Sequence, residues 1–161
     1  PLQVESIVDE VISLLSPSIH PSVEVEKNNL SKTKIMADPT QIHQVAMNLF
    51  TNAIHALPDT GGKLTITLED VRINETLHLG LDELGPGTYV SMEVADNGQG
   101  MDEYTLERIF DPYFTTKKSG EGTGLGLAVV SGIIQEHKGI IKAYSNEGKG
   151  SRFRVYLPAA G

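Results

Sequence analysis

The chain has 161 residues, of which 39% are hydrophobic and 21% are charged, as is ordinary for a single soluble globular domain. Its formal net charge of −8, with the acidic residues spread along the chain, argues against binding to nucleic acid or direct contact with an anionic membrane. Cysteine is absent, which excludes disulfides and thiol catalysis and favours a reducing compartment such as the cytoplasm.

The start of the chain is predicted to form a helix and then a pair of strands. Apolar residues recur at helical spacing over residues 2–15, and the prolines that follow end this helix. Residues 23–27 alternate between apolar and polar side chains, which is typical of a strand. Residues 34–37 are interpreted as the partner of that strand across a polar turn.

A longer helix follows, and its start is marked clearly. Asp38 before Pro39 is typical of a helix N-cap with proline at the first helical position. Apolar spacing carries this helix to Leu57. Its inner face is predicted to consist of Ile42, Val45, Ala46, Leu49, Ala53 and Ile54.

The middle of the chain is predicted to contain two paired strands and a short helix. Residues 63–71 and 89–96 alternate cleanly and are expected to pair through the polar, turn-rich connection over residues 72–87. A short helix capped at Asp102 comes next. Residues 111–124 contain proline, lysines and glycines without periodicity, which predicts a mobile loop.

The last part of the chain completes a mixed sheet with helices on one face. Residues 124–137 are predicted to be helical, with Gly139 as the C-terminal cap. The last strands are expected over residues 140–145 and 151–158. This order of elements predicts one α+β domain over residues 1–161, a two-layer α/β sandwich.

Three glycine-bearing stretches stand out: DNGQGM at 96–101, GTGLGL at 122–127 and GKGSRF at 148–153. Each by itself is more often a structural turn than a ligand site. The second stretch follows a loop, not the first strand of a βαβ unit, so it is no dinucleotide fingerprint. It also lacks the terminal Lys-Ser or Lys-Thr of a Walker loop.

The GTGLGL stretch nevertheless has a physical logic as a phosphate site. Glycines before a helix let backbone N–H groups converge on an anion, which the helix dipole favours at that end. Lys117 and Lys118 lie in the preceding loop and could fold over a polyphosphate. A lysine pair on a loop is otherwise just solvated.

Asp96 ends a strand whose alternation places it on the apolar face. A carboxylate facing inward is costly unless it meets a hydrogen-bond donor. It could simply cap the following turn. It could also accept a hydrogen bond from an exocyclic amine such as that of adenine, with Gly98 and Gly100 leaving space for the ring.

The longer helix carries Asn48, Asn52 and His55 on one side. Asparagine is a mediocre helix former, so two of them in an apolar segment indicate a buried polar site. An amide oxygen can ligate a magnesium ion that is already carried by phosphates. The alternative, in which both amides bond neighbouring backbone, stays open for this pair alone.

Together, the stretches NLFTNAIHAL, DNGQGM, RIFDPYFTTK, GTGLGLAVV and GKGSRF resemble, in order and spacing, the five sequence boxes of histidine kinases. These boxes belong to the catalytic, ATP-binding domain of two-component sensor kinases, in the superfamily shared with gyrase, MutL and the ATP-lid chaperones. The resemblance covers nearly the whole chain. It implies the Bergerat-type ATP-binding fold, in which ATP lies between helices and sheet under a mobile lid.

The resemblance also implies roles for individual residues. It implies catalytic roles for Asn48, Asn52, His55 and Lys117, with Asn52 as the magnesium ligand. It implies ATP contacts from Asn52, His55, Asp96, Gly98, Gly100, Met101, Phe110, Thr116, Lys117, Gly122, Thr123, Gly124, Leu125, Gly126, Leu127 and Ser151. Phe110 and Phe114 would flank the start of the lid. Ser151 stands where the family usually has threonine, and Tyr113 replaces a common phenylalanine.

The resemblance implies partners as well, because the family's phosphoacceptor histidine lies in a separate dimerisation domain. None of the five histidines here has the sequence context of that acceptor. The chain starts at a proline and is expected to be a piece of a longer kinase, which could be membrane-anchored. Its expected partners are the dimerisation domain of that kinase and, through it, a response regulator receiver domain.

Two other functions are weighed against histidine phosphorylation. The first is ATP hydrolysis coupled to conformational change; those relatives place a glutamate at the position of Asn48 to activate water. An amide cannot take a proton at neutral pH, whereas a neutral imidazole nucleophile needs little deprotonation, so Asn48 favours the kinase. The second is a non-catalytic nucleotide-sensing module, which would be expected to lack motif residues.

Overall fold

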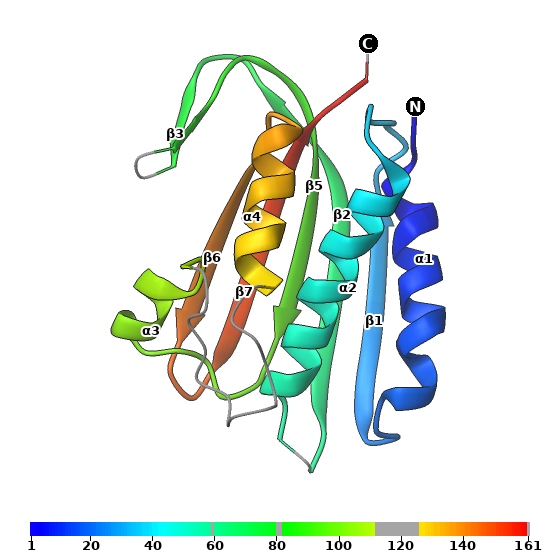
Figure 1. Cartoon of the computed structure of the whole chain (residues 1–161), viewed down its shortest axis with the longest axis vertical. Coiled ribbons are helices and arrows are strands. Elements are labelled where there is room, and N and C mark those ends of the chain that lie inside the picture. Colours follow the sequence, from blue (N-terminus) through cyan, green and yellow to red (C-terminus); the bar gives the residue numbers. More distant parts are fainter. Residues whose placement is uncertain (59, 80–81, 112–125, 161) are drawn as a thin grey trace.

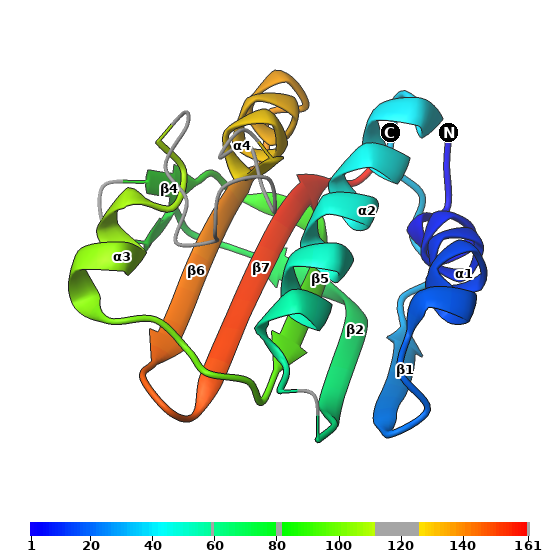
Figure 2. The same cartoon turned by 60° about the horizontal axis from the view of Figure 1, so that its bottom comes forward.

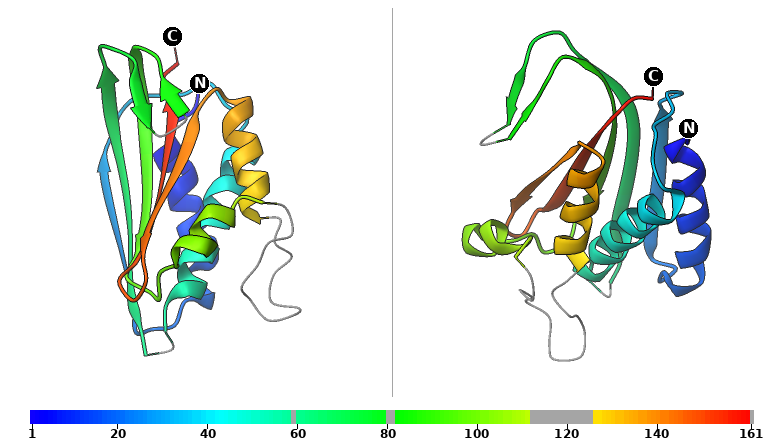
Figure 3. Two further views of the ribbon diagram at one scale, coloured as in Figure 1. Left: turned by 90° about the vertical axis from the view of Figure 1, so that its left-hand side faces the viewer. Right: turned by 45° about the horizontal axis from the view of Figure 1, so that its top comes forward.

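The computed structural model describes residues 1–58, 60–79, 82–111 and 126–160, and it places helices on one face of a five-stranded sheet (Figure 1 and Figure 3). The helices are α1 (Val4–Leu15), α2 (Pro39–Ala56), α3 (Glu103–Arg108) and α4 (Gly126–Glu136), with a 3-10 turn, η1 (Ser16–Ser18), after α1. The strands of the sheet are β1 (Val23–Leu30), β2 (Gly62–Ile73), β5 (Gly87–Asp96), β6 (Ile140–Asn146) and β7 (Gly150–Pro158). A two-stranded ribbon consists of β3 (Leu77–Leu79) and β4 (Asp82–Leu84). The α+β sandwich predicted from the sequence is confirmed.

The strands lie in the order β1-β2-β5-β7-β6, which Figure 2 shows from one end. The pairing of β2 with β5 is antiparallel, as expected, and so are β5 with β7 and β7 with β6. The pairing expected for residues 34–37 is wrong. β1 pairs with β2 in parallel, because α2 intervenes and returns the chain to the same end of the sheet. Ile35 instead forms isolated bridges with Leu2 and Ala159, which is why α1 begins only at Val4.

Helix α2 lies between α1 and α4 on the covered face of the sheet (Figure 1). The Asp38 side chain accepts a hydrogen bond of 2.9 Å from the Thr40 amide, so the predicted N-cap is confirmed. The predicted inner face is buried except at Ile54, which packs at the edge of the core. The sheet contributes Leu64, Ile66, Leu68, Val90, Met92, Val94, Phe153, Val155 and Leu157 to the same core.

The C-terminus of α4 differs by one residue from the prediction. Lys138, not Gly139, takes the left-handed conformation, with φ of 62°. The Lys138 amide donates to the Gln135 carbonyl and the Gly139 amide to the Ile134 carbonyl, the pattern of a Schellman motif. Gly139 is needed for another reason, because a Cβ there would lie 2.1 Å from the Tyr156 carbonyl oxygen.

The other face of the sheet carries no helix among the described residues, and we call it the open face. At one end of it, the β3–β4 ribbon packs Leu84 against Ile73, Tyr89 and Tyr156 in a second, smaller apolar cluster. Farther along, Arg154 donates to Ser91 Oγ and to Glu69 Oε1, each at 2.9 Å. Polar groups on this face are therefore paired across strands.

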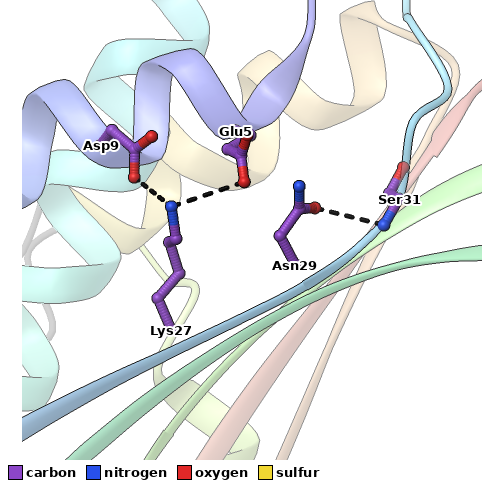
Figure 4. Close-up of polar contacts among 5 residues, drawn as sticks. All are labelled: Glu5, Asp9, Lys27, Asn29 and Ser31. Carbon is purple, nitrogen blue, oxygen red and sulfur yellow. Dashed lines mark hydrogen bonds and ion pairs between the residues drawn. The ribbon is translucent and has the colours of Figure 1, made fainter.

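Helix α1 is joined to the sheet by charge as well as by its apolar face. Lys27 Nζ of β1 contacts Asp9 and lies 3.5 Å from Glu5 Oε2 (Figure 4). Glu5 and Asp9 lie one helical turn apart on α1. Beyond it, the Asn29 side chain accepts from the Ser31 amide at 3.2 Å and caps the end of β1 (Figure 4). Among the described residues, no helix combines the length and the apolar composition of a membrane span.

Candidate nucleotide site

Asp96 is the last residue of β5 and lies on the helix-covered face of the sheet, directly opposite Ser151 of β7. Its Oδ1 accepts a hydrogen bond of 2.9 Å from the Gly98 amide. Burial raises the pKa of the Asp96 carboxyl above its ordinary value, and the amides of Gly98 and Ser151 offset part of that rise. Among the described residues, no salt bridge involves Asp96. It is therefore a half-buried acceptor, and its contacts within the described ranges are with backbone N–H donors.

The glycines around Asp96 are required by the packing of the chain itself. A Cβ at Gly98 would lie 2.2 Å from the Ala56 carbonyl oxygen at the end of α2, where the Gln99 amide also bonds at 3.1 Å. At Gly100 and Gly150, both with positive φ, a Cβ would lie 2.1 Å from backbone oxygens. These contacts dock the loop after β5 between α2 and the β6–β7 hairpin. The expected space for a ring beside Gly98 and Gly100 stays a prediction.

A chain of hydroxyl groups supports this loop from the β6–β7 hairpin. The Met101 amide donates to Ser145 Oγ at 2.7 Å, and Ser145 Oγ lies 2.8 Å from Ser151 Oγ. Ser145 Oγ also donates to the Gly150 carbonyl at 3.1 Å. Sequence reasoning named Met101 and Ser151 but missed Ser145. Counting strand register back from the NEGKG turn pairs Ser145 with Ser151, and that was the available signal.

The polar residues of α2 lie beside the start of α4. Asn48 Nδ2 donates to the Gly126 carbonyl at 3.5 Å, so the first residue described in α4 touches the polar side of α2. Asn48 and Asn52 are both half-buried, whereas His55 lies exposed in the last turn of α2. The same-side placement predicted for these three residues follows from the helix that is observed. Asn48 and Gly126, 78 residues apart in sequence, are thus brought together.

The remaining predicted residues fall into two groups. Leu127 and Phe110 pack at the edge of the core, and the Phe110 ring meets Phe153 edge-on with centroids 6.3 Å apart. Outside the described residues lie Phe114, Thr116, Lys117, Lys118, Gly122, Thr123, Gly124 and Leu125, and with them the expected mobile loop.

The far ends of α2 and α4 are joined as well. His137, just after α4, donates through Nδ1 to the Ile133 carbonyl at 2.8 Å. Its Nε2 then accepts from the Asp38 amide at 3.4 Å, at the N-cap of α2. Contacts at both ends therefore fix the spacing between the helix that carries the asparagines and the helix that follows the GTGLGL stretch.

The expected magnesium ion would find few ligands in the described part of the chain alone. Among the described residues, no group of three or more His, Asp or Glu side chains is placed to hold a metal. The half-buried amides of Asn48 and Asn52, beside the start of α4, are oxygen donors of the kind that magnesium accepts when phosphates supply its other ligands. The residues present fit an ion that arrives with a nucleotide.

The sequence of the chain is similar to those of known ATP-binding proteins and sensor kinases. Residues 37–161 match the family described as histidine kinase-, DNA gyrase B-, and HSP90-like ATPase. The sensor kinase CckA of Brucella abortus is 43% identical over 124 residues, which are 77% of this chain and 13% of that protein. The sensor histidine kinase ZraS of Salmonella typhi is 45% identical over 130 residues, 81% of this chain and 24% of that protein. The chain thus spans a quarter or less of these relatives.

Solved structures are similar over almost the full length of this chain. The catalytic domain of histidine kinase ThkA is 31% identical, with a TM-score of 0.78 over 98% of this chain and 95% of that one. Full-length ShkA in complex with AMPPNP is 26% identical, with a TM-score of 0.77 over 99% of this chain and 31% of that one. The chain therefore belongs to the family of histidine kinase-, DNA gyrase B- and HSP90-like ATPases, as an ATP-binding domain of the sensor histidine kinase type.

Proposed function

We propose that the chain binds ATP together with magnesium and transfers the γ-phosphoryl group to a histidine of a separate dimerisation domain in the same kinase. In that step a bond forms between an imidazole nitrogen and the γ-phosphorus, the bond to the β–γ bridging oxygen breaks, and ADP leaves. The phosphorylated histidine would then donate its phosphoryl group to a response regulator receiver domain.

The observation that carries this proposal is the setting of Asp96. A half-buried carboxylate with a raised pKa and no ion-pair partner among the described residues is costly to keep, and it suits an uncharged donor such as the adenine amine. It lies beside the end of α2, since the Gln99 amide in the loop that follows it is bonded to the Ala56 carbonyl at the end of that helix. Both features support adenine at Asp96 and phosphates toward α2 and α4.

The side chains of α2 supply the phosphate end of the proposed site. The Asn52 amide oxygen would hold the magnesium ion, which would neutralise charge on the phosphates when bound. His55, exposed in the last turn of α2, would contact a phosphate oxygen. Lys117 and the glycines from 122 to 126 would complete the anion site; of these, only Gly126 is among the described residues.

Asn48 favours phosphoryl transfer over hydrolysis. Its side chain bonds the Gly126 carbonyl and is an amide, which cannot take a proton from water at neutral pH. A neutral imidazole nitrogen already has a free lone pair and needs no base at this position. ATP hydrolysis as the main activity is the second candidate, and the experiment separates the two.

The experiment measures two rates with magnesium and labelled ATP: release of ADP by the chain alone, and label transfer to the dimerisation domain of the same parent kinase. We expect slow release and label transfer in trans. Brisk hydrolysis without the acceptor and no labelled histidine would overturn the kinase in favour of the ATPase. No nucleotide binding at all, by calorimetry, would overturn both.

Two substitutions on α2 sharpen the result. Asn52→Ala should abolish transfer but keep part of the binding measured without magnesium, because only the metal ligand is lost. Gln44→Ala, at an exposed position of the same helix, is the matched control and should change neither. Asn48→Glu tests whether a carboxylate at that position raises hydrolysis; equal hydrolysis by wild type and variant would argue against a base position there.

A further inference from the structure

The three contacts of Ser145 Oγ determine where two hydroxyl protons lie. A serine hydroxyl has one proton to donate and two lone pairs to accept with. Ser145 accepts from the Met101 amide, which can only donate, and donates to the Gly150 carbonyl, which can only accept. Its remaining contact, 2.8 Å from Ser151 Oγ, is a hydrogen bond only if Ser151 is the donor. One arrangement therefore satisfies all three contacts.

That arrangement fixes the chemical character of Ser151. A free serine hydroxyl rotates and can donate to one ligand and accept from another. Ser151 is buried at 8% exposure, and its proton is held by Ser145, so it is not available to a ligand. What remains for a ligand is its oxygen, an acceptor. Asp96, directly opposite on β5, is also an acceptor as long as its carboxyl is ionised.

We propose that Ser145 is a positioning residue for nucleobase specificity, which holds the Ser151 proton so that Asp96 and Ser151 face the base as acceptors only. The inference rests on the proposed ATP site. A base edge with an amine donor, as in adenine, matches two acceptors. A base with a keto oxygen at the same place, as in hypoxanthine or guanine, would put an acceptor opposite two acceptors. No hydrogen bond could form there, so such a base is rejected.

Ser145 is separated from Asp96 by Ser151, so we expect it to act on a base at Asp96 only through Ser151. It belongs to β6, the edge strand of the sheet, and Ser151 of β7 lies between it and Asp96 of β5. Its second contact, with the Met101 amide, holds the end of the loop that carries Gly98 and Gly100. Loss of the hydroxyl should therefore weaken the preference for ATP over a keto base, beyond any general loosening of the loop.

The test compares ATP with inosine triphosphate, which carries an oxygen in place of the amine, by calorimetry with magnesium. The readout is the ratio of the two dissociation constants, inosine triphosphate over ATP. Ser145→Val should lower this ratio roughly three- to ten-fold, because the freed Ser151 hydroxyl can turn and donate to the keto oxygen. Ser145→Thr has the same shape as the valine variant but keeps the hydroxyl, and it should keep the wild-type ratio.

Two further variants complete the design. Ser91→Ala removes a buried serine on the open face and should leave the ratio unchanged, as a control for lost stability. Ser151→Ala decides the case even if the valine variant does not fold: an acceptor-only Ser151 predicts that ATP loses more affinity than inosine triphosphate. Equal losses, or a larger loss for inosine triphosphate, would overturn the inference.

The outcomes separate this inference from the proposed function. A wild-type chain that binds no nucleotide would overturn both. A wild-type chain that prefers ATP, with the same ratio in Ser145→Val as in Ser145→Thr, would leave the ATP site standing and overturn the role of Ser145 alone.

Discussion

On the open face of the sheet, Ser91 is 1% exposed and its hydroxyl accepts a hydrogen bond from Arg154, which also pairs with Glu69. On the covered face, five residues farther along the same strand, Asp96 is half-buried and is approached by backbone amides alone among its described contacts. The Ser91 hydroxyl has its hydrogen-bond partner within the chain and contributes to stability. The Asp96 carboxyl has a raised pKa and is suited to accept from a donor on a ligand. Polar groups buried on one strand can therefore serve opposite purposes.

The largest expected effect is on nucleotide affinity at the covered face. Asp96→Asn should weaken ATP binding roughly 10- to 100-fold, because a charged acceptor is replaced by an amide that presents either a donor or an acceptor. Thermal stability should not fall, since the variant removes a desolvated carboxyl. Calorimetry and thermal unfolding measure the two quantities.

The matched control for this variant is Glu69→Gln on the open face, which likewise changes one carboxylate to an amide. It should leave ATP affinity unchanged, because Glu69 pairs with Arg154 on the face that carries no helix in the described part of the chain. Equal loss of affinity in both variants would show that charge in general matters, and the contrast between the faces would fail.

The mirror-image experiment is Arg154→Met. It should lower the free energy of unfolding by about 1–3 kcal/mol, because the buried Ser91 hydroxyl loses its donor, while ATP affinity stays unchanged. Denaturant unfolding measures this change. Adding Ser91→Ala to the same chain should recover part of the loss, since no buried hydroxyl then lacks a partner. A double variant no more stable than Arg154→Met alone would mean that the arginine acts through packing on Tyr156.

The sequence was sufficient for the local elements. Asp38 and Pro39 start α2, and the 3.6-residue spacing of its apolar positions gave its buried face, because capping and periodicity depend on neighbours in the chain. Asp102 caps α3 in the same way, with its side chain accepting from the Thr105 amide at 2.8 Å. The inward direction of Asp96 also followed from alternation along β5.

Contacts between distant residues were not predictable in the same way. The parallel pairing of β1 with β2 joins Val23 to Gly62, and alternation along one strand says nothing about such a partner. Gly98 and Gly150 are tight against Ala56 and Asp96, which only the folded chain brings near. The bond from Asn48 to Gly126 is of this kind too. The resemblance to histidine kinases predicts that the five sequence boxes form one site, whereas the periodicity of apolar residues does not predict which boxes meet.

The pH dependence of Asp96 should produce a smaller effect than its substitution. Its folded pKa is raised, so its contribution to stability is present below the ordinary aspartate pKa and is lost as the pH rises through the folded value. The stability of Asp96→Asn relative to wild type should therefore increase from acid toward neutral pH. In the same window, falling pH should weaken ATP binding to wild type more than to the variant, because protonation removes the negative charge of the carboxylate and turns one of its two acceptor oxygens into a donor. If stability and ATP affinity changed with pH in the same way in both proteins, Asp96 would not be the group that titrates at this site.

The smallest expected effect concerns a charge on the covered face that the chain itself neutralises. Lys27 keeps 28% of its side chain exposed between Asp9 and Glu5, and its contact with Asp9 raises the pKa of the ammonium. Such partly exposed pairs contribute little, so Lys27→Met, which keeps the apolar stem, should cost about 0.2–1 kcal/mol in denaturant unfolding, less at high salt. Because the pKa is raised, the contribution holds below the ordinary lysine value and is lost only as the pH rises through the folded one. A cost above that of Arg154→Met would show that any carboxylate left without its cation on the covered face, such as Asp9 or Glu5 in this variant, is expensive. Asp96 would then be one case of a general rule for that face and no special sign of a ligand.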